Sequence, residues 1–171
     1  MCGIYGIAKS PKPYTRKQSR IAKKVLRHNA VDSETRGSHS SGIASIGETA
    51  TIYKSLLRSA KFVDCKEYNT ATKSLDEGNN ILIGHTRFAT EGAIVLNNAH
   101  PFQVGMTIGA HNGCVYNIAE MQTQLDKQCP VDSQLIFKSI DTTDNIQDAV
   151  KDFDSDFALS YVKDNPNILY L

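Results

Sequence analysis

The sequence predicts an α+β fold, a layered sandwich of antiparallel strands and helices. Short apolar segments bounded by turn residues occur in pairs around helical blocks, a pattern that disfavours a doubly wound parallel sheet. The chain has 171 residues, of which 40% are hydrophobic and 22% are charged, as expected for one globular domain. No apolar stretch approaches the roughly 18 residues of a membrane span, so we expect a soluble protein without membrane contact.

The first half of the chain is expected to contain four strands and two helices. Residues 4–8 form a short apolar strand, which the proline cluster at 11–13 ends. Residues 15–28 are predicted to be helical, because Thr15 is a capping residue type and Ile21, Val25 and Leu26 keep helical spacing. The polar segment 34–42 is expected to be a loop. It is followed by strands at 43–46, 51–55 and 81–83, with a helix at 61–75.

The second half is expected to pair further strands with three helices. A strand at 106–111 should end at Asn112-Gly113, because this dipeptide is a strong turn signal. Helices are predicted at 118–125, 133–140 and 146–153. A terminal hairpin is predicted from residues 157–162 and 168–171.

Cysteine usage and the N-terminus indicate a cellular compartment. The cysteines at positions 2, 65, 114 and 129 contain no CxxC pair, which argues against a disulfide framework or a four-cysteine zinc site. The N-terminus lacks the basic and apolar regions of a secretory signal. We therefore expect a cytoplasmic protein with reduced thiols.

Charge is unevenly distributed, although the net charge is only +1. This small net charge argues against nucleic acid as a general partner. Residues 1–31 carry eight basic side chains and no acid, whereas residues 141–171 carry seven aspartates and two lysines. The basic run is either a docking patch for a partner or the solvated face of an amphipathic helix. The second interpretation is favoured, because charged faces are common on surface helices.

Cys2 is the first candidate for catalysis. Methionine aminopeptidases remove an initiator that precedes a small residue, so the mature chain is expected to begin at this cysteine. A free α-amine has a pKa of about 7.7–8.0 and can take the proton of a thiol near pH 7. One residue then supplies both nucleophile and base, as in N-terminal nucleophile hydrolases.

Six fragments occur in a telling order: Cys2-Gly-Ile-Tyr-Gly6, Arg36-Gly-Ser-His-Ser-Ser-Gly42, Gly84-His-Thr-Arg-Phe-Ala-Thr90, Asn98-Ala-His-Pro-Phe102, His111-Asn-Gly113 and Val131-Asp-Ser133. Together they resemble the class II glutamine amidotransferases over residues 2–140, and more loosely as far as the terminal hairpin. The resemblance implies a four-layer αββα sandwich of antiparallel sheets, shortened at its C-terminal end. It also implies that residues 1–171 are a single glutaminase domain without a synthase or acceptor domain.

The same resemblance implies a reaction. Cys2 would attack the side-chain amide of L-glutamine, form a γ-glutamyl thioester and release ammonia for an acceptor substrate. No cofactor and no metal is implied, and the expected partners are glutamine and a synthase subunit that receives the ammonia. The acceptor itself is not encoded in any recognisable segment.

The resemblance assigns Asn112 and Gly113 to the oxyanion hole, where a side-chain amide and a backbone N–H would stabilise the tetrahedral intermediate. Arg87 would bind the α-carboxylate of glutamine, because guanidinium forms two parallel hydrogen bonds to a carboxylate. Asp132 would bind the α-ammonium group, and Thr90 would add a polar contact.

Arg36 would support the loop and the Cys2 terminus beside the substrate. Simpler interpretations stay open for each site residue. Asn112-Gly113 can be a hairpin turn, Arg87 a surface ion-pair partner and Asp132 the N-cap of the helix at 133–140. Arg36 can be an ordinary loop arginine.

Three positions depart from the family pattern. Phe88 stands where many members have tryptophan, Glu91 where histidine is usual, and Ser38-His39 where proline-aspartate is common. None of them is a nucleophile, an oxyanion donor or a member of the Arg87–Asp132 pair. The departures bear on loop closure and on coupling to an acceptor more than on hydrolysis.

Other functions compete with this one. A papain-like dyad could pair Cys114 with His111 or His85, but Cys114 follows a predicted turn and stands between apolar residues. A zinc site could use His85, His100 and Cys114, but these residues have no recognisable spacing. Cys114 is expected to be a small buried residue and His85 a structural residue at a strand end. The same fold could hydrolyse another linear amide. A catalytically silent regulatory module would be favoured if Met1 were retained.

Overall fold

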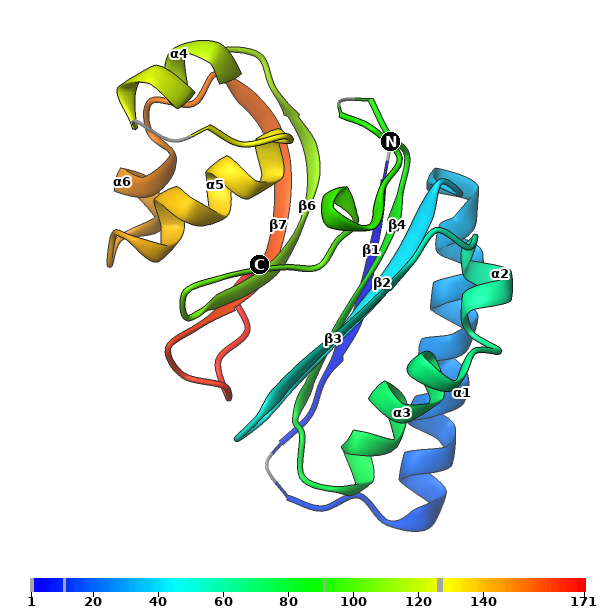
Figure 1. Cartoon of the computed structure of the whole chain (residues 1–171). Coiled ribbons are helices and arrows are strands. Elements are labelled where there is room, and N and C mark those ends of the chain that lie inside the picture. Colours follow the sequence, from blue (N-terminus) through cyan, green and yellow to red (C-terminus); the bar gives the residue numbers. More distant parts are fainter. Residues whose placement is uncertain (1, 11, 91, 126–127) are drawn as a thin grey trace.

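The computed structural model describes residues 2–10, 12–90, 92–125 and 128–171, and it arranges them in four layers (Figure 1). Two antiparallel sheets lie face to face, and helices cover the outer face of each sheet. The predicted α+β sandwich and its αββα order are therefore confirmed. Met1, Pro11 and Glu91, which the sequence analysis named, lie outside the described residues.

The larger sheet has the strand order β1-β4-β2-β3. Its strands are β1 (Gly3–Ala8), β2 (Ser40–Ile46), β3 (Ala50–Ser55) and β4 (Ile81–Arg87), and all its pairings are antiparallel. The smaller sheet has the order β5-β6-β7 and consists of β5 (Phe102–Val104), β6 (Thr107–Val115) and β7 (Ser155–Lys163). Because β1 pairs with β4 from Gly3 onward, the N-terminal residue Cys2 lies at the same sheet end as Arg87.

Helices fill the two outer layers (Figure 1). The larger sheet is covered by α1 (Arg16–Ser33), α2 (Ser59–Phe62) and α3 (Lys66–Lys73), and the smaller sheet by α4 (Ile118–Gln124), α5 (Asp132–Asp141) and α6 (Ile146–Val150). In the described part of the chain there are also three 3-10 turns: η1 (Glu34–Arg36), η2 (Ser74–Asp76) and η3 (Leu96–Asn98). Among the described residues, no helix combines the length and the apolar content that a bilayer crossing requires.

The core has three parts, one at each interface between layers. Leu26 and Phe62 pack under α1 and α2 against the larger sheet, and Phe137 of α5 packs against the smaller one. Between the sheets lie short aliphatic side chains such as Ile83 and Ala110. These apolar layers fix the two sheets relative to each other, so the strand ends that carry the site have a defined spacing.

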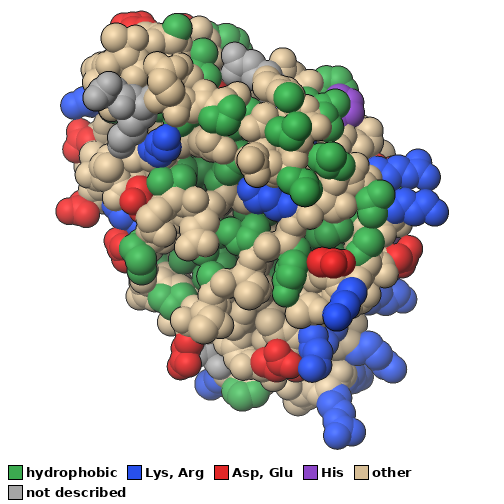
Figure 2. Space-filling model, in the orientation of Figure 1, with side chains coloured by type: hydrophobic (Ala, Val, Ile, Leu, Met, Phe, Trp, Pro, Cys, Tyr) green, Lys and Arg blue, Asp and Glu red, His purple; other side chains and the backbone are tan. Residues whose placement is uncertain are grey.

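Helix α1 confirms the predicted helix but buries fewer apolar side chains than expected. Thr15 is its N-cap, in a reciprocal capping box with Gln18. Leu26 is fully buried, whereas Ile21 and Val25 are about half exposed, because the helix packs through Ser19, Leu26 and Ala30 instead. The basic side chains gather at the edge of the molecule that α1 forms (Figure 2). Of the two interpretations of the basic run, the solvated face of a helix therefore fits α1.

Several predicted boundaries are wrong because strand pairing overrides local turn signals. The loop predicted at 34–42 gives way to β2 at Ser40, which pairs with Arg87 as β4 continues beyond the predicted 81–83. Strand β6 runs through Asn112-Gly113, so this dipeptide is not a turn. The predicted helix at 61–75 is divided into α2, α3 and η2, and β5 was not predicted.

Two predictions near the C-terminus also need correction. Asp132 is the first residue of α5 and not its N-cap, which is the extended Val131. The predicted hairpin strand at 168–171 is reduced to a single bridge, in which Tyr161 and Tyr170 exchange two backbone hydrogen bonds of 3.0 and 2.8 Å.

Candidate active site

The candidate nucleophile lies where the two sheets meet. The backbone N–H of Cys2 donates a hydrogen bond of 3.1 Å to Asn112 Oδ1, which projects from β6 of the opposite sheet. The Phe88 backbone N–H, directly after β4, donates to Cys2 Sγ at 3.3 Å. The three segments that the sequence analysis singled out separately therefore converge on one thiol.

The contact with Cys2 orients the Asn112 amide. An asparagine side chain has one acceptor oxygen and one donor nitrogen, and here the oxygen faces the N–H of Cys2. The Nδ2 group is consequently the part of the amide available as a donor. A donor held beside the nucleophile is what an oxyanion hole requires.

Gly113 is needed for a close approach between strands. Its register partner is Phe157, and a Cβ at position 113 would lie 2.1 Å from the backbone oxygen of Asp156. Its φ of +156° is also a conformation that other residues rarely adopt. The glycine therefore allows the close contact between β6 and β7 beside the thiol. It lies within a strand and does not form a turn.

Arg36 holds the N-terminal segment. It is the last residue of η1, and its Nε donates a hydrogen bond of 2.8 Å to the backbone oxygen of Cys2. A cation bonded to this carbonyl fixes the backbone of the nucleophile. The structure thus places Arg36 against Cys2 itself.

Arg87 and Asp132 are both buried, with 4% and 7% of their surfaces exposed. Arg87 Nη1 donates to the Ala93 backbone oxygen at 3.1 Å. Asp132 accepts hydrogen bonds from the backbone N–H groups of Val115 at 3.2 Å and Ser133 at 2.7 Å. Two buried groups of opposite charge are thus each held by hydrogen bonds to backbone groups, an arrangement that could accept a ligand carrying both charges.

The cavity between this pair and the thiol is small. It has a volume of about 20 Å³ and is lined by Cys2, Arg87, Thr90 and Asp132 among others. That volume suffices for about one water molecule. An amino acid is larger than this space, so its binding requires the lining side chains to move.

Burial governs the protonation of the site. It raises the pKa of the Cys2 thiol, against the opposing effects of the Phe88 backbone and the Arg87 charge. Burial also lowers the pKa of Arg87, while Cys2 and Asp132 act in the other direction. A thiol with a raised pKa is protonated at rest, so its activation needs a base beside it.

A second, larger cavity opens on the other side of Cys2. Its volume is about 380 Å³, and it shares Cys2, Phe88, Thr90 and Gly113 with the small cavity. The remaining lining residues come from β6, β7 and the turn after β6: Asn112, Cys114, Tyr116, Asp156 and Phe157. Cys114 is half-buried and not the buried residue that was expected.

Three buried histidines pack behind the site. The rings of His85 and His100 lie 4.0 Å apart between centroids, and His111 Nδ1 shares a hydrogen bond of 2.8 Å with Ser133 Oγ. Burial lowers the pKa of His85 to about 3 and that of His100 well below its usual value. His85 is interior to β4 and bonds the His111 backbone, so it is structural but not at a strand end.

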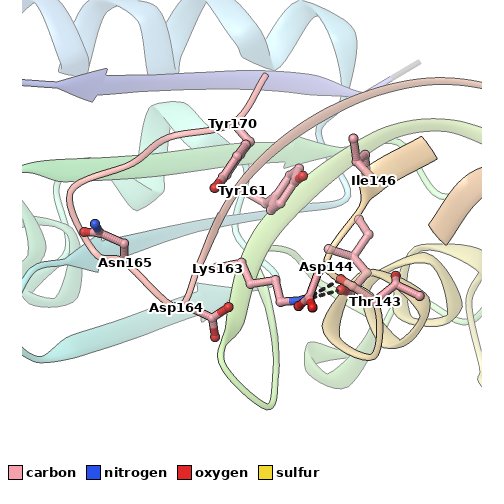
Figure 3. Close-up of a pocket in the computed structure, with 9 residues that line it drawn as sticks. Thr143, Asp144, Ile146, Tyr161, Lys163, Asp164, Asn165 and Tyr170 are labelled. Carbon is pink, nitrogen blue, oxygen red and sulfur yellow. Dashed lines mark hydrogen bonds and ion pairs between the residues drawn. The ribbon is translucent and has the colours of Figure 1, made fainter. Parts of the chain in front are cut away.

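A separate pocket of about 200 Å³ lies where α5 and β7 end (Figure 3). Lys163 Nζ donates to the backbone oxygens of Ile140 and Thr143 and lies 3.9 Å from Asp144. Tyr161 and Tyr170 stack on one another with centroids 4.9 Å apart. The lysine thus caps α5 and the tyrosines secure the C-terminal segment, which gives this pocket a structural role.

The structure brings all the predicted site residues together around Cys2. Cys2, Thr90 and Gly113 line both cavities; Arg87 and Asp132 line the small one and Asn112 the large one. Sequence reasoning missed Tyr116, Asp156 and Phe157. Two of these are on β7, which reaches the site only through its register with β6, and no local pattern marks that register.

The comparisons with known proteins agree on one family. Residues 8–159 match the class-II glutamine amidotransferases. The glutamine–fructose-6-phosphate aminotransferase (isomerizing) of Gluconobacter oxydans is 37% identical over 126 residues, which are 74% of this chain and 19% of that protein. The enzyme of the same name from Methanococcus maripaludis is 31% identical over 159 residues, which are 90% of this chain and 23% of that protein. The chain therefore spans about a fifth of the length of these relatives.

A solved structure has a similar fold. The glutamine phosphoribosylpyrophosphate amidotransferase of B. subtilis superposes with a TM-score of 0.65 and 20% sequence identity. The alignment covers 94% of this chain and 35% of that one. Nearly the whole chain therefore shares a known arrangement of two facing sheets and outer helices.

Proposed function

The chain belongs to the class-II glutamine amidotransferases, and from this premise we propose that its site hydrolyses the side-chain amide of L-glutamine. The observation that carries the proposal is the position of Cys2. Its backbone nitrogen is bonded to Asn112, its thiol contacts Phe88, and it lines a cavity with Arg87 and Asp132. A nucleophile, an oxyanion donor and a charge pair for an amino acid are thus held together.

The reaction begins with activation of the thiol. Removal of the initiator methionine leaves the nitrogen of Cys2 as an α-amine, which stays within hydrogen-bond distance of Asn112 Oδ1. This amine takes the proton of the half-buried thiol, and Sγ attacks the amide carbon of glutamine. The Asn112 Nδ2 group and the Gly113 backbone N–H stabilise the oxyanion.

The first half-reaction ends when the C–N bond breaks and the α-amine returns its proton to the departing ammonia. Water then attacks the γ-glutamyl thioester, and glutamate leaves as the C–S bond breaks. Arg87 binds the α-carboxylate and Asp132 the α-ammonium throughout, and Thr90 adds a polar contact at the mouth. Arg36 holds the Cys2 carbonyl and thereby the direction of the nucleophile.

The domain organisation and partner follow as part of the proposal. Residues 1–171 act as one glutaminase domain, and a synthase domain or subunit consumes the ammonia. The relatives are named glutamine–fructose-6-phosphate aminotransferases, and these names support a sugar phosphate as the acceptor. A cytoplasmic location is in keeping with the four cysteines being free thiols in the described part of the chain.

The test combines mass spectrometry with a hydrolysis assay. The intact mass shows whether Met1 is removed. Incubation with L-glutamine should release glutamate and ammonia in equal amounts, and acid quenching should trap a γ-glutamyl adduct on the peptide that begins with Cys2. Retention of Met1 together with an absence of glutamate would favour the catalytically silent module. Hydrolysis of an amide without amino-acid ends, in preference to glutamine, would favour the other linear-amide hydrolase.

A further inference from the structure

The cavity on the open side of Cys2 is much larger than the leaving group of glutamine. Ammonia is about the size of water, which occupies about 30 Å³ in the liquid. The cavity has a volume of about 380 Å³ and contains the nucleophile and the oxyanion residues in its wall. A cavity of about 150 Å³ already accommodates a benzene ring. This side of the site therefore has room for an aromatic group.

The two cavities suit different parts of a substrate. The small cavity offers Arg87 and Asp132 for the charged end of an amino acid. No cationic side chain occurs among the described residues that line the large cavity, so they offer an α-carboxylate no opposite charge. Because the γ-glutamyl part points to Arg87, the amine that leaves must point into the large cavity.

The walls of the large cavity suit an apolar amine. Phe88, Tyr116 and Phe157 contribute aromatic side chains, and Cys114 contributes a polarizable thiol. Among the described lining residues Asp156 supplies the charge, and its carboxylate accepts a hydrogen bond of 3.3 Å from the Tyr116 hydroxyl. A negative charge at this wall disfavours an amine that carries a carboxylate of its own.

We propose that the site also hydrolyses γ-glutamyl amides of neutral or cationic aromatic amines, with the amine bound in the large cavity; this rests on the proposed cysteine chemistry. Cys2 Sγ bonds to the γ-carbon, the C–N bond breaks, and the thiol proton passes through the α-amine to the aromatic amine. Water then breaks the thioester. The net reaction converts a γ-glutamyl amide and water into glutamate and a free amine.

The experiment compares three substrates on the purified protein: L-glutamine, L-γ-glutamyl-p-nitroanilide and its 3-carboxy derivative. The two anilides release a coloured amine and differ by one carboxylate. We expect hydrolysis of glutamine and of the p-nitroanilide, with a kcat/KM for the carboxylated anilide at least about tenfold lower, a difference typical of an unfavourable charge contact. In Asp156→Asn this discrimination should shrink.

Cavity variants separate a specific pocket from the intrinsic reactivity of an anilide. Cys114→Phe fills the cavity from β6 and should lower kcat/KM for the p-nitroanilide at least about tenfold more than for glutamine. Tyr116→Ala removes a wall from an exposed position and should raise the KM of the anilide. Met106→Ala, an exposed apolar residue outside both cavities, should change neither activity.

The outcomes distinguish this inference from the proposed function. Glutamine hydrolysis without anilide hydrolysis overturns the inference and leaves the glutaminase intact. Anilide hydrolysis without glutamine hydrolysis supports the inference and overturns ammonia release as the reaction. Inactivity toward all three substrates, with Met1 removed, overturns both. An equal loss of both activities in Cys114→Phe and Tyr116→Ala would overturn the assignment of the cavity.

Discussion

His39 and Phe88 stack on one another, with ring centroids 4.9 Å apart and an interplanar angle of 25°. Both belong to the departures from the family pattern that the sequence analysis named, and in the structure their rings are in contact. His39 Nδ1 also accepts a hydrogen bond of 2.9 Å from the Ala89 N–H. The histidine therefore anchors the beginning of the segment that closes the small cavity over Cys2.

Substitution of His39 should weaken glutamine binding. His39→Ala removes both the ring contact and the acceptor for Ala89, each worth about 1 kcal/mol. We expect the KM for glutamine to rise about tenfold, with a smaller change in kcat, because the chemical groups stay in place. His39→Gln keeps an acceptor but loses the ring, so its KM should be intermediate. A fall in kcat alone would contradict the anchoring role.

Cys2 should be the sole nucleophile. Cys2→Ala should abolish glutamine hydrolysis and labelling by a diazoketone analogue of glutamine, because the thioester forms on the Cys2 sulfur. Cys65→Ala and Cys129→Ala should keep both, since neither residue lines the cavities around Cys2. Peptide mapping should find the label on Cys2 in the unmodified sequence and in Cys114→Ala. A label on Cys114 would support the papain-like alternative.

Substrate-binding and oxyanion residues should separate in their kinetics. Arg87→Lys and Asp132→Asn should raise the KM strongly, because each loses a charged contact with one end of glutamine. Asn112→Ala should instead lower kcat by about a hundredfold or more, the usual effect of a lost oxyanion donor. Steady-state assays over a wide glutamine range would resolve the two parameters. Small, equal effects at all three positions would indicate structural roles only.

Gly113 offers a test of the strand contact. In Gly113→Ala the new methyl group would clash with the Asp156 backbone oxygen, so β7 must shift away from the site. We expect a lower melting temperature and a large loss of glutamine hydrolysis. Gly78→Ala is the matched control, because Gly78 also has a positive φ but has open space at its Cβ. Equal destabilisation of both variants would show that backbone strain, and not the clash, is responsible.

Much of the fold could be predicted from local patterns because most elements carry their own signal. Thr15 and Gln18 cap α1, a short apolar run marks β1, and alternating apolar residues mark β7. Asn112-Gly113 shows the limit of this reasoning. The dipeptide favours a turn, but antiparallel pairing with Ala158 and Phe157 in β7 outweighs that preference. Pairing between distant strands is a tertiary effect that a local window does not contain.

The sequence likewise predicts some residues of the candidate site and misses others. Cys2, Arg87 and Asp132 could be identified because each belongs to a distinctive fragment of sequence. The His39–Phe88 contact and the Tyr116–Asp156 hydrogen bond could not, since each joins residues about 40 or more positions apart without a charge or spacing signal. The large cavity arises only where β6 and β7 meet the segment after β4.

Acidification should destabilise the protein through its buried histidines. Burial lowers the pKa of His85 to about 3, whereas an unfolded histidine has a pKa of about 6.5. Between these values the unfolded chain binds more protons than the folded one, so the free energy of unfolding falls as the pH falls through this window. A single such histidine contributes a slope of roughly 1.4 kcal/mol per pH unit. Chemical denaturation between pH 6.5 and 4.5 should show this slope reduced in His85→Gln. His28→Gln, at an exposed position, is the control and should leave the slope unchanged. Equal slopes in the unmodified protein, His85→Gln and His28→Gln would show that His85 becomes protonated without unfolding.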